Sequence, residues 1–328
     1  LLIVPGFVDL HVPGGGGADA LAGAEAVRIC AHCHARHGTT AFLPTPVTAP
    51  PDDLRTAVDG IAAVAADRRT GEARVLGAHL EGPYLTPERL GAQPPYPQAP
   101  DIAEIEDLCG RVDVRLVTLA PEIDADHAMT RYLASHGVAV QIGHSAATYE
   151  ETCAAMAHGA RGFTHLFNAM TPLHHRAPGV VGAALAHAEY AALIPDLVHV
   201  HAGAILAAHR AIPRLFCVTD ATAAAGMPDG DYPLGRHTVH KKGASVFLDD
   251  GTLAGSALTM DQGLRNLVAA GIDLAAAIRC LSTYPADFIG ASDRGRIAEG
   301  AMADLVALDR DLDIVAVFVE GEAIDLAV

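Results

Sequence analysis

The sequence predicts an α/β fold built as a (β/α)8 TIM-like barrel with a small β appendage domain. Three observations indicate this. Apolar runs rich in β-branched residues alternate with helical segments, which is the pattern of parallel strands joined by crossover helices. The 328 residues are 51% hydrophobic, enough for one large core. Several polar side chains also fall where the apolar runs end, and a barrel brings those ends to one face.

Eight apolar runs are the expected barrel strands. They are Gly6–Val12, Thr40–Pro44, Val75–Leu80, Val114–Leu119, Ala139–Gly143, Gly162–His165, Leu197–His201 and Leu215–Asp220. Between them, helical spacing predicts helices such as Ala24–His37, Asp52–Arg68, Asp126–His136, Tyr149–His158 and Ala202–His209. The proline-rich stretch Gln93–Pro100 cannot form a regular helix, so we expect an ordered loop there.

We expect residues 1–290 to form the barrel domain and residues 291–328 the C-terminal part of the small β domain. Helices are predicted at Thr259–Gly271 and Leu274–Thr283, followed by strand-like pieces at Ala303–Leu308 and Ile314–Val319 and a turn at Glu320–Glu322. Two short strands alone are barely stable. The chain starts at Leu1 without an initiator methionine, and we expect the pairing strands to belong to a preceding N-terminal segment.

Charge and cysteine content exclude several classes of protein. A formal charge of −17 argues against a general nucleic-acid or anionic-membrane surface. Neither a secretory leader nor an apolar stretch of membrane-spanning length is evident, so we expect a cytoplasmic protein. Six cysteines in a chain of this length are too sparse for a disulfide scaffold, and we expect reduced thiols.

Metal-capable or acid-base side chains lie at or near the C-terminal ends of six predicted strands. They are His11, Glu81, His144, His165, His199 and Asp220. Glu81, His144 and His165 supply two imidazoles and one carboxylate, the ligands of a catalytic divalent ion that keeps a position open for water. Zinc suits this set best, although iron or another divalent ion also fits. Asp220 could then manage the proton of that water, while the alternative is that it caps the next helix.

Three other features have plainer explanations. Cys30, Cys33, His34 and His37 align on one face of a predicted helix, as a small metal site would, but free cysteine also serves as a small hydrophobic residue. The glycines at 14–17 could cradle phosphate, although such runs more often let a ligand approach the backbone. Arg176, in the loop after the sixth strand, could bind phosphate or form a surface ion pair.

Six motifs resemble those of the N-acetylglucosamine-6-phosphate deacetylase family, which belongs to the amidohydrolase superfamily. They are Pro-Gly-Phe-Val-Asp-Leu-His, His-Leu-Glu-Gly-Pro-Tyr, Gly-His-Ser, Thr-His-Leu-Phe-Asn-Ala-Met, Val-Thr-Asp-Ala and Leu-Ala-Gly-Ser-Ala-Leu-Thr-Met. The resemblance runs from about Pro5 to the C-terminus. It implies hydrolysis of the acetamide of N-acetyl-D-glucosamine 6-phosphate in amino-sugar catabolism, giving acetate and D-glucosamine 6-phosphate.

The resemblance also implies the role of each site residue. Glu81, His144 and His165 would hold one divalent metal ion, and Asp220 would be the proton donor and acceptor. The implied substrate-binding residues are Ala92, Gln93, Asn168, Ala169, Arg176, Asp196, His199, Leu253, Ala254 and Gly255. Arg176 would reach the phosphate in the neighbouring active site, which implies a homodimer, and His199 would polarise the acetyl carbonyl.

Two departures from the family pattern bear on function. Many members have His-x-His after the first strand, whereas this chain has His11 and Pro13, so we expect a second metal site around His11 to be weak or absent. Gln93 stands where some relatives have histidine. Two rival functions stay open, namely deacetylation of N-acetylgalactosamine 6-phosphate or another amide, and a non-catalytic barrel that binds an amino-sugar phosphate.

Overall fold

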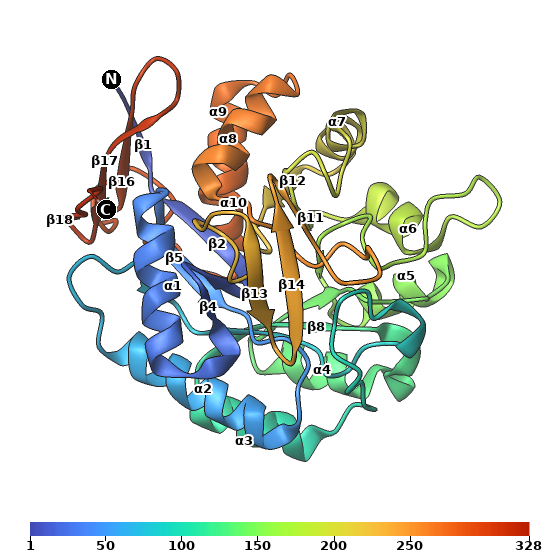
Figure 1. Ribbon diagram of the computed structural model, residues 1–328. Coiled ribbons are helices and arrows are strands. Elements are labelled where there is room, and N and C mark those ends of the chain that lie inside the picture. Colours follow the sequence, from blue (N-terminus) through green and yellow to red (C-terminus); the bar gives the residue numbers. More distant parts are fainter. Residues whose placement is uncertain (328) are drawn as a thin grey trace.

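Parallel strands surrounded by helices form the body of the protein in the computed structural model, which describes residues 1–327 (Figure 1). The strands of the body are β2 (Phe7–Val12), β5 (Thr39–Pro44), β6 (Arg74–Val75), β7 (Ala78–Glu81), β8 (Val114–Leu119), β9 (Ala139–Ile142), β10 (Gly162–Phe163), β11 (Tyr190–Leu193) and β12 (Arg214–Cys217). They pair in parallel as three groups, ordered β2-β5-β6, β7-β8-β9-β10 and β11-β12. The α/β class predicted from the sequence is therefore confirmed.

Hydrogen bonds connect these groups just beyond the strand ends at two of the three junctions. Leu166 N–H donates to Ala192 O at 2.7 Å, which links the segment after β10 to β11. Asp220 N–H donates to His11 O at 3.0 Å, which links the segment after β12 back to β2. Within residues 1–327 the strands form three hydrogen-bonded groups and not one continuous ring, so full closure into an eight-stranded barrel stays a prediction.

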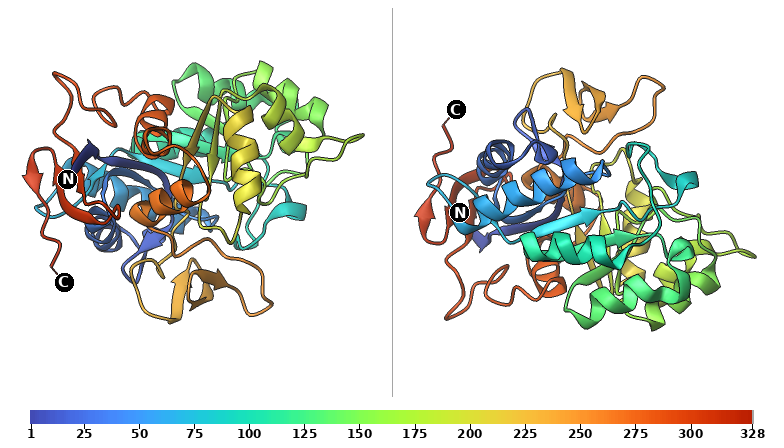
Figure 2. Two further views of the ribbon diagram at one scale, coloured as in Figure 1. Left: turned by 90° about the horizontal axis from the view of Figure 1, so that it is seen from above. Right: turned by 90° about the horizontal axis from the view of Figure 1, so that it is seen from below.

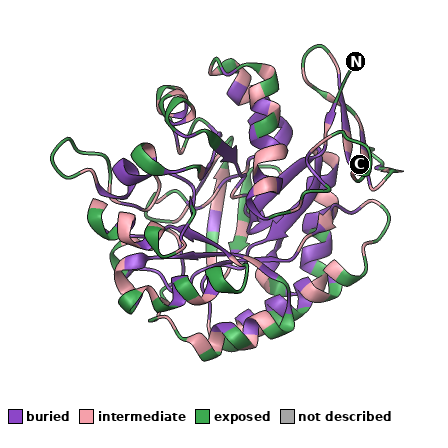
Figure 3. Ribbon diagram, turned by 180° about the vertical axis from the view of Figure 1, so that it is seen from behind, coloured by how far each residue is buried: buried purple, intermediate pink, exposed green. Residues whose placement is uncertain are grey.

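The two faces of the strands pack into different apolar clusters. Val8, Leu10, Ala41 and Leu43 alternate along β2 and β5 and share one cluster with Phe216 of β12. Phe7 of β2 and Phe42 of β5 instead join the larger cluster beneath the helices. Figure 3 shows this pattern, with buried strands inside and helices exposed on their outer sides. Burial on both faces is typical of parallel strands covered by helices.

The helices lie around the outside of the strands. They are α1 (Ala24–Arg36), α2 (Pro51–Ala66), α3 (Ile102–Arg111), α4 (Ala128–Ser135), α5 (Tyr149–Ala157), α6 (Gly179–His187), α7 (Ala202–Ala211), α8 (Met260–Ala269), α9 (Leu274–Leu281) and α10 (Thr283–Phe288), with 3-10 turns η1 (Ala20–Ala22), η2 (Pro87–Arg89), η3 (Pro121–Ile123) and η4 (Ala125–His127). Helix α3 was not predicted from the sequence, although Asp101 caps it by accepting the N–H of Ala103. None of the described helices combines the length and apolarity that crossing a bilayer requires.

The predicted seventh strand, Leu197–His201, is wrong. The strand is Tyr190–Leu193, and the predicted segment is a loop. Asp196 Oδ1 accepts the N–H groups of both Val198 and His199, at 2.9 and 2.8 Å, and this local turn competes with strand pairing. Alternating valine and histidine in the predicted segment resembles the pattern of a strand. The true strand, Tyr190–Leu193, contains two alanines and therefore has a weaker strand pattern in the sequence.

The predicted third strand, Val75–Leu80, is divided into β6 and β7 by Gly77. This glycine has a φ of 133°, and a Cβ atom there would lie 2.2 Å from Asp113 O. No larger residue fits without moving the backbone of the neighbouring strand. The break lets β7 continue toward Glu81 beside β8.

The small sheet contains a strand from each end of the chain. Its order is β1 (Leu2–Pro5), β16 (Leu305–Leu308), β17 (Ile314–Val319) and β18 (Glu322–Ala323), all antiparallel. Strand β1, which pairs with β16, thus lies within this chain. We had expected the pairing strands to belong to a preceding N-terminal segment. Figure 1 shows both termini together at this edge, where Arg74 binds Glu320 at 2.7 Å and joins the sheet to the body.

A three-stranded antiparallel sheet interrupts the body after β12 and was not predicted. It consists of β13 (Gly230–Leu234), β14 (His237–Lys242) and β15 (Ser245–Phe247), and Figure 2 shows it projecting from one face. Asp19, which ends the short hairpin β3–β4 (Gly14–Gly15 and Ala18–Asp19), accepts Gly235 N–H at 2.5 Å. Arg236 pairs with Asp53 at 2.9 Å, so the turn between β13 and β14 is held against the body.

Candidate metal centre and surrounding cavity

A cavity of about 400 Å³ lies at the carboxyl ends of the parallel strands. Its lining includes most of the site residues predicted from the sequence, namely Glu81, Ala92, Gln93, His144, His165, Asn168, Ala169, His199, Asp220, Leu253 and Gly255. Asp196, Ala254 and Arg176 are not part of this wall. The strand-end residues therefore do meet, although up to 139 positions separate Glu81 from Asp220 in the sequence.

Three of these side chains direct a ligand atom toward one point. Glu81 Oε1 lies 3.2 Å from His144 Nε2 and 3.1 Å from His165 Nε2, and the two imidazole nitrogens are 3.1 Å apart. All three residues are at least 95% buried. Among the described residues they form the one group of histidine, cysteine or acidic side chains whose geometry could hold a metal ion.

The hydrogen-bond roles of these atoms fit a cation. His144 Nδ1 lies 2.8 Å from Arg89 O, and since a carbonyl only accepts, this nitrogen carries the proton. The Nε2 of the neutral ring is then an acceptor that faces Glu81 Oε1, also an acceptor. A divalent cation satisfies both at once, and this fit is typical of a histidine whose other nitrogen is bound by the protein.

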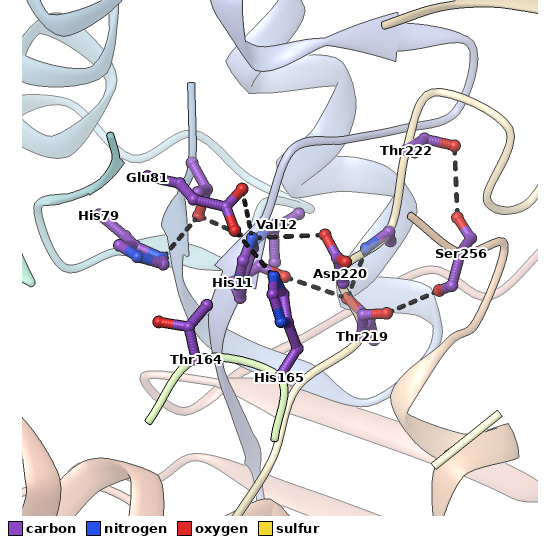
Figure 4. Close-up of polar contacts among 12 residues, drawn as sticks. His11, Val12, His79, Glu81, Thr164, His165, Thr219, Asp220, Thr222 and Ser256 are labelled. Carbon is purple, nitrogen blue, oxygen red and sulfur yellow. Dashed lines mark hydrogen bonds and ion pairs between the residues drawn. The ribbon is translucent and has the colours of Figure 1, made fainter. Parts of the chain in front are cut away.

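His11 lies between the carboxylates of Glu81 and Asp220, as Figure 4 shows. His11 Nε2 is 3.2 Å from Glu81 Oε2 and 3.3 Å from Asp220 Oδ1, without the geometry of a hydrogen bond to either. Burial lowers the pKa of His11, but the two carboxylates outweigh it and raise the pKa to about 9. Burial raises the pKa of Asp220, and the charge of Glu81 adds to this effect while His11 opposes it.

The backbone is strained at three of the strand-end residues. His144, His165 and Asp220 have φ angles of 50°, 29° and 50°, in a region that side-chain-bearing residues rarely adopt. Each such residue costs on the order of 1–3 kcal/mol and persists only where the surrounding structure imposes it. This strain turns each side chain sharply from its strand into the cavity and supports a functional role.

The residues Gly255 and Ser256, which follow Leu253 and Ala254, fix the position of Asp220. Ser256 N–H donates to Asp220 O at 2.7 Å, and Ser256 Oγ donates to Thr219 O at 2.6 Å. Gly255 has a φ of 57°, and a Cβ there would lie 2.8 Å from Asp220 O. The glycine is therefore required for this close approach of two backbones.

The glycine run at 14–17 is a structural loop in this fold. Its N–H groups at Gly14, Gly16 and Gly17 donate to the carbonyl oxygens of Ala221, Ala225 and Ala223 at 2.7–2.8 Å. A phosphate cradle needs free N–H groups. The loop instead joins the end of β2 to the segment that follows Asp220.

His199 reaches the cavity from the loop after β11, not from a strand end. Its Nδ1 lies 2.6 Å from Asp196 Oδ2, which leaves Nε2 as the other polar atom of the ring. Burial lowers the pKa of His199, but the bond to Asp196 outweighs it, and the net direction is upward. Asp196 thus orients His199, although Asp196 itself does not line the cavity.

A polar network beneath the candidate ligands was not predicted from the sequence. His79 Nε2 lies 2.8 Å from Thr118 Oγ1, which lies 2.6 Å from Thr164 Oγ1, and Thr164 donates to Gln141 at 3.1 Å. The ring of His79 also packs edge-on against His11 at 4.7 Å. The available signal was the spacing of His79 and Glu81, because residues two apart on a strand share a face.

The cavity wall of this chain contains one arginine, Arg89, whereas Arg176, which we expect to serve the neighbouring subunit, lies outside it. Arg89 is the single lysine or arginine among the described lining residues, and its guanidinium has no ion pair there. Arg176 is exposed in the loop between β10 and α6, where its guanidinium donates to Nε2 of the neighbouring His175 at 2.7 Å. Asn168 binds the backbone through Nδ2, at 3.1 Å from His165 O.

Comparisons with known proteins agree with this geometry. The model of the amidohydrolase family matches residues 2–324. The chain is 40% identical to an N-acetylgalactosamine-6-phosphate deacetylase of Escherichia coli O157:H7, over 98% of this chain and 87% of that protein. It is 39% identical to the N-acetylglucosamine-6-phosphate deacetylase of Vibrio furnissii, over 98% and 82% of the two chains.

Solved structures show the same likeness. The N-acetylglucosamine-6-phosphate deacetylase of Pasteurella multocida superposes with a TM-score of 0.93 at 33% identity, covering 98% of this chain and 86% of that one. A mutant of the Mycobacterium smegmatis enzyme in complex with N-acetyl-D-glucosamine-6-phosphate gives a TM-score of 0.92 at 37% identity, with the same coverage. The family resemblance stated from the motifs is confirmed, and the chain belongs to the amidohydrolase family.

Proposed function

We propose that this chain hydrolyses the acetamide of N-acetyl-D-glucosamine 6-phosphate to D-glucosamine 6-phosphate and acetate, as a step of amino-sugar catabolism. The convergence of Glu81, His144, His165 and Asp220 on one cavity is the observation that carries this proposal. The deacetylases that are 36–40% identical over nearly the whole chain support the same reaction.

We assign one divalent ion, zinc, to Glu81, His144 and His165. An ion of this kind polarises a carbonyl oxygen and lowers the pKa of water. A second ion would need His11, but Pro13 offers no ligand where a second histidine would be required. We therefore expect one firmly held equivalent per chain.

The remaining steps belong to side chains of this protein. Asp220 would accept a proton from the attacking water and return it to the departing nitrogen. His199, held by Asp196, would donate a hydrogen bond from Nε2 to the acetyl oxygen as negative charge develops there. Asn168, Ala169 and the segment 253–255 would contact the sugar, which their place around the cavity supports.

The phosphate requires a cation, and we assign Arg176 of a neighbouring subunit in a homodimer. Its position on an exposed loop, away from the cavity of its own chain, supports a reach toward another copy. Arg89 is the alternative within the same chain because it lines the cavity. An arginine fork suits a phosphate dianion better than any other side chain on this acidic protein.

We also propose that the parallel strands close into a single eight-stranded barrel, residues 291–328 forming the C-terminal part of the small domain. The links Leu166 to Ala192 and Asp220 to His11 support closure at two of the junctions between groups. Structures of related deacetylases superpose over 98% of the chain and support the same architecture.

The second candidate substrate is N-acetylgalactosamine 6-phosphate, which the 40% identity to the Escherichia coli O157:H7 protein favours. Acetate release from the two epimeric sugar phosphates, with and without added zinc, separates the possibilities. The larger kcat/KM identifies the epimer. Binding of both sugars without zinc-dependent acetate release would instead indicate a non-catalytic binding barrel.

A further inference from the structure

The side chain of Gln93 is fixed at both ends inside the protein. Its Oε1 accepts the backbone N–H of Thr48 at 2.8 Å, and its Nε2 donates to Glu81 Oε2 at 2.6 Å. A backbone N–H can only donate, so the amide oxygen must face Thr48 and the NH2 group must face Glu81. The residue is 92% buried, which leaves its side chain little freedom to turn.

This contact gives the two oxygens of Glu81 different surroundings. Oε1 faces His144 Nε2 and His165 Nε2, whereas Oε2 faces Gln93 Nε2 and, at 3.2 Å, His11 Nε2. A short hydrogen bond to an ionised carboxylate is among the stronger kinds in proteins. Gln93 thus fixes the rotation of the carboxylate and keeps Oε1 directed at the two imidazoles.

The same short segment also orients a second candidate ligand. It runs from Thr86 through η2 to Gln93, and Arg89 O accepts from His144 Nδ1 at 2.8 Å. The N–H of Thr86 donates to His144 O at 3.1 Å, which ties the segment to the backbone at that residue. One segment of eight residues therefore contacts two of the three candidate ligands on the side away from the ion.

We propose that Gln93 is a positioning residue for the metal ion and not primarily a contact for the sugar. Through Glu81 it sets how tightly the ion is held, because a carboxylate free to rotate has to be ordered again each time the ion binds. The proposal rests on the metal centre of the proposed function. It differs from the role that the family resemblance implies for this position, in which the side chain contacts substrate.

The test measures zinc affinity in the absence of substrate, so that it does not depend on turnover. Metal-free protein is titrated with zinc against a chromophoric chelator of known affinity. Gln93→Met keeps the length of the side chain and removes both hydrogen-bonding groups, and we expect zinc affinity to fall by roughly 10- to 100-fold. Saturating zinc should restore acetate release, with KM for the sugar phosphate within about threefold of wild type.

Gln98 provides a matched control on the same loop. Its Nε2 donates to Glu104 Oε2 at 2.6 Å, a glutamine-to-carboxylate bond of the same length that lies outside the cavity wall. Gln98→Met removes that bond, and zinc affinity should stay within about twofold of wild type.

A second variant keeps the test decisive if Gln93→Met does not fold. Gln93→Asn is shorter by one methylene group and cannot reach Thr48 and Glu81 together, so zinc affinity should fall here as well. Unchanged zinc affinity with a raised KM in either folded variant would overturn the proposal and make Gln93 a substrate contact. Failure of the wild-type protein to bind zinc would instead refute the metal centre itself.

Discussion

Two groups of metal-capable side chains stand out among the described residues, and only one of them has the geometry of a metal site. At the strand ends, Glu81, His144 and His165 come from three different strands, and their ligand atoms meet. On α1, Cys30, Cys33 and His34 share one helix as the sequence predicted, and His37 is the residue that caps its C-terminal end. Both groups looked suitable in the sequence, so the difference lies in what each side chain contacts.

The α1 group is used for packing. His34 Nε2 lies 2.8 Å from Gly14 O, the sulfurs of Cys30 and Cys33 face backbone carbonyls, and His37 pairs with Asp261 at 3.3 Å. Burial raises the pKa of Cys33 to about 11, and a protonated thiol is a poor metal ligand. All six cysteines are free, as expected. Neighbours on one helix face thus point to separate partners, whereas strand ends aim at a common centre.

The largest effect should come from Asp220, the acid-base residue proposed for the strand-end group. Asparagine has nearly the same shape and tolerates the left-handed backbone at this position. Asp220→Asn should therefore fold and retain zinc, while kcat falls by ~10²–10⁴. Steady-state acetate release and zinc content measured on the same preparation check this, and activity within about tenfold of wild type would reject the role.

The phosphate contact should give the next largest effect and tests whether the strand-end site is complete within one chain. Arg176→Ala should raise KM by roughly 10- to 100-fold, since a hydrogen bond to a charged group contributes ~1.5–3 kcal/mol. Exposed Arg210 at the end of α7 serves as a control, and Arg210→Ala should leave KM unchanged.

Mixed dimers distinguish the two arginine assignments. A dimer of one Arg176→Ala chain and one Asp220→Asn chain has one intact site if Arg176 acts across the interface, so activity at low substrate should reappear on mixing. A raised KM in Arg89→Ala together with a normal KM in Arg176→Ala would place the phosphate contact within the chain instead.

The comparison also shows what the sequence could and could not reveal. His144, His165 and Asp220 were predictable because each ends an apolar run, and parallel strands bring such ends together. The contact of Gln93 with Thr48 could not be predicted, because it joins a side chain to a backbone N–H that lies 45 positions away in the sequence. His199 was correctly predicted to line the cavity, but the strand predicted to carry it is a loop. The turn formed by Asp196 depends on hydrogen bonds to the backbone, which the spacing of apolar residues does not reveal.

His34 should affect stability and its pH dependence without affecting zinc. Burial lowers its pKa to about 4, so the unfolded chain, with an ordinary pKa near 6.5, binds the proton more readily. The stability that neutral His34 provides is therefore complete above about pH 6.5 and is lost as the pH falls from there toward about 4, by up to about 3 kcal/mol.

Urea unfolding of the metal-free protein between pH 7 and pH 4 measures this contribution. His34→Gln can still donate to Gly14 O but does not titrate, so its free energy of unfolding should fall less over that range than that of the wild type. Parallel curves for the two proteins would show that His34 is not the group responsible.

The smallest effect should come from removing a thiol of the α1 group. Cys33→Ser preserves the contact with Ala225 O, which lies 3.6 Å from the sulfur. The substitution removes the thiol sulfur, the atom of this side chain that could bind a soft metal ion. Elemental analysis should find close to one zinc per chain in both wild type and Cys33→Ser, and near zero in His165→Ala. Two tightly bound equivalents in the wild type would contradict the single-ion centre, and loss of one of them in Cys33→Ser would place a second ion on α1. An unchanged single equivalent is what the divergent contacts of the α1 side chains lead us to expect.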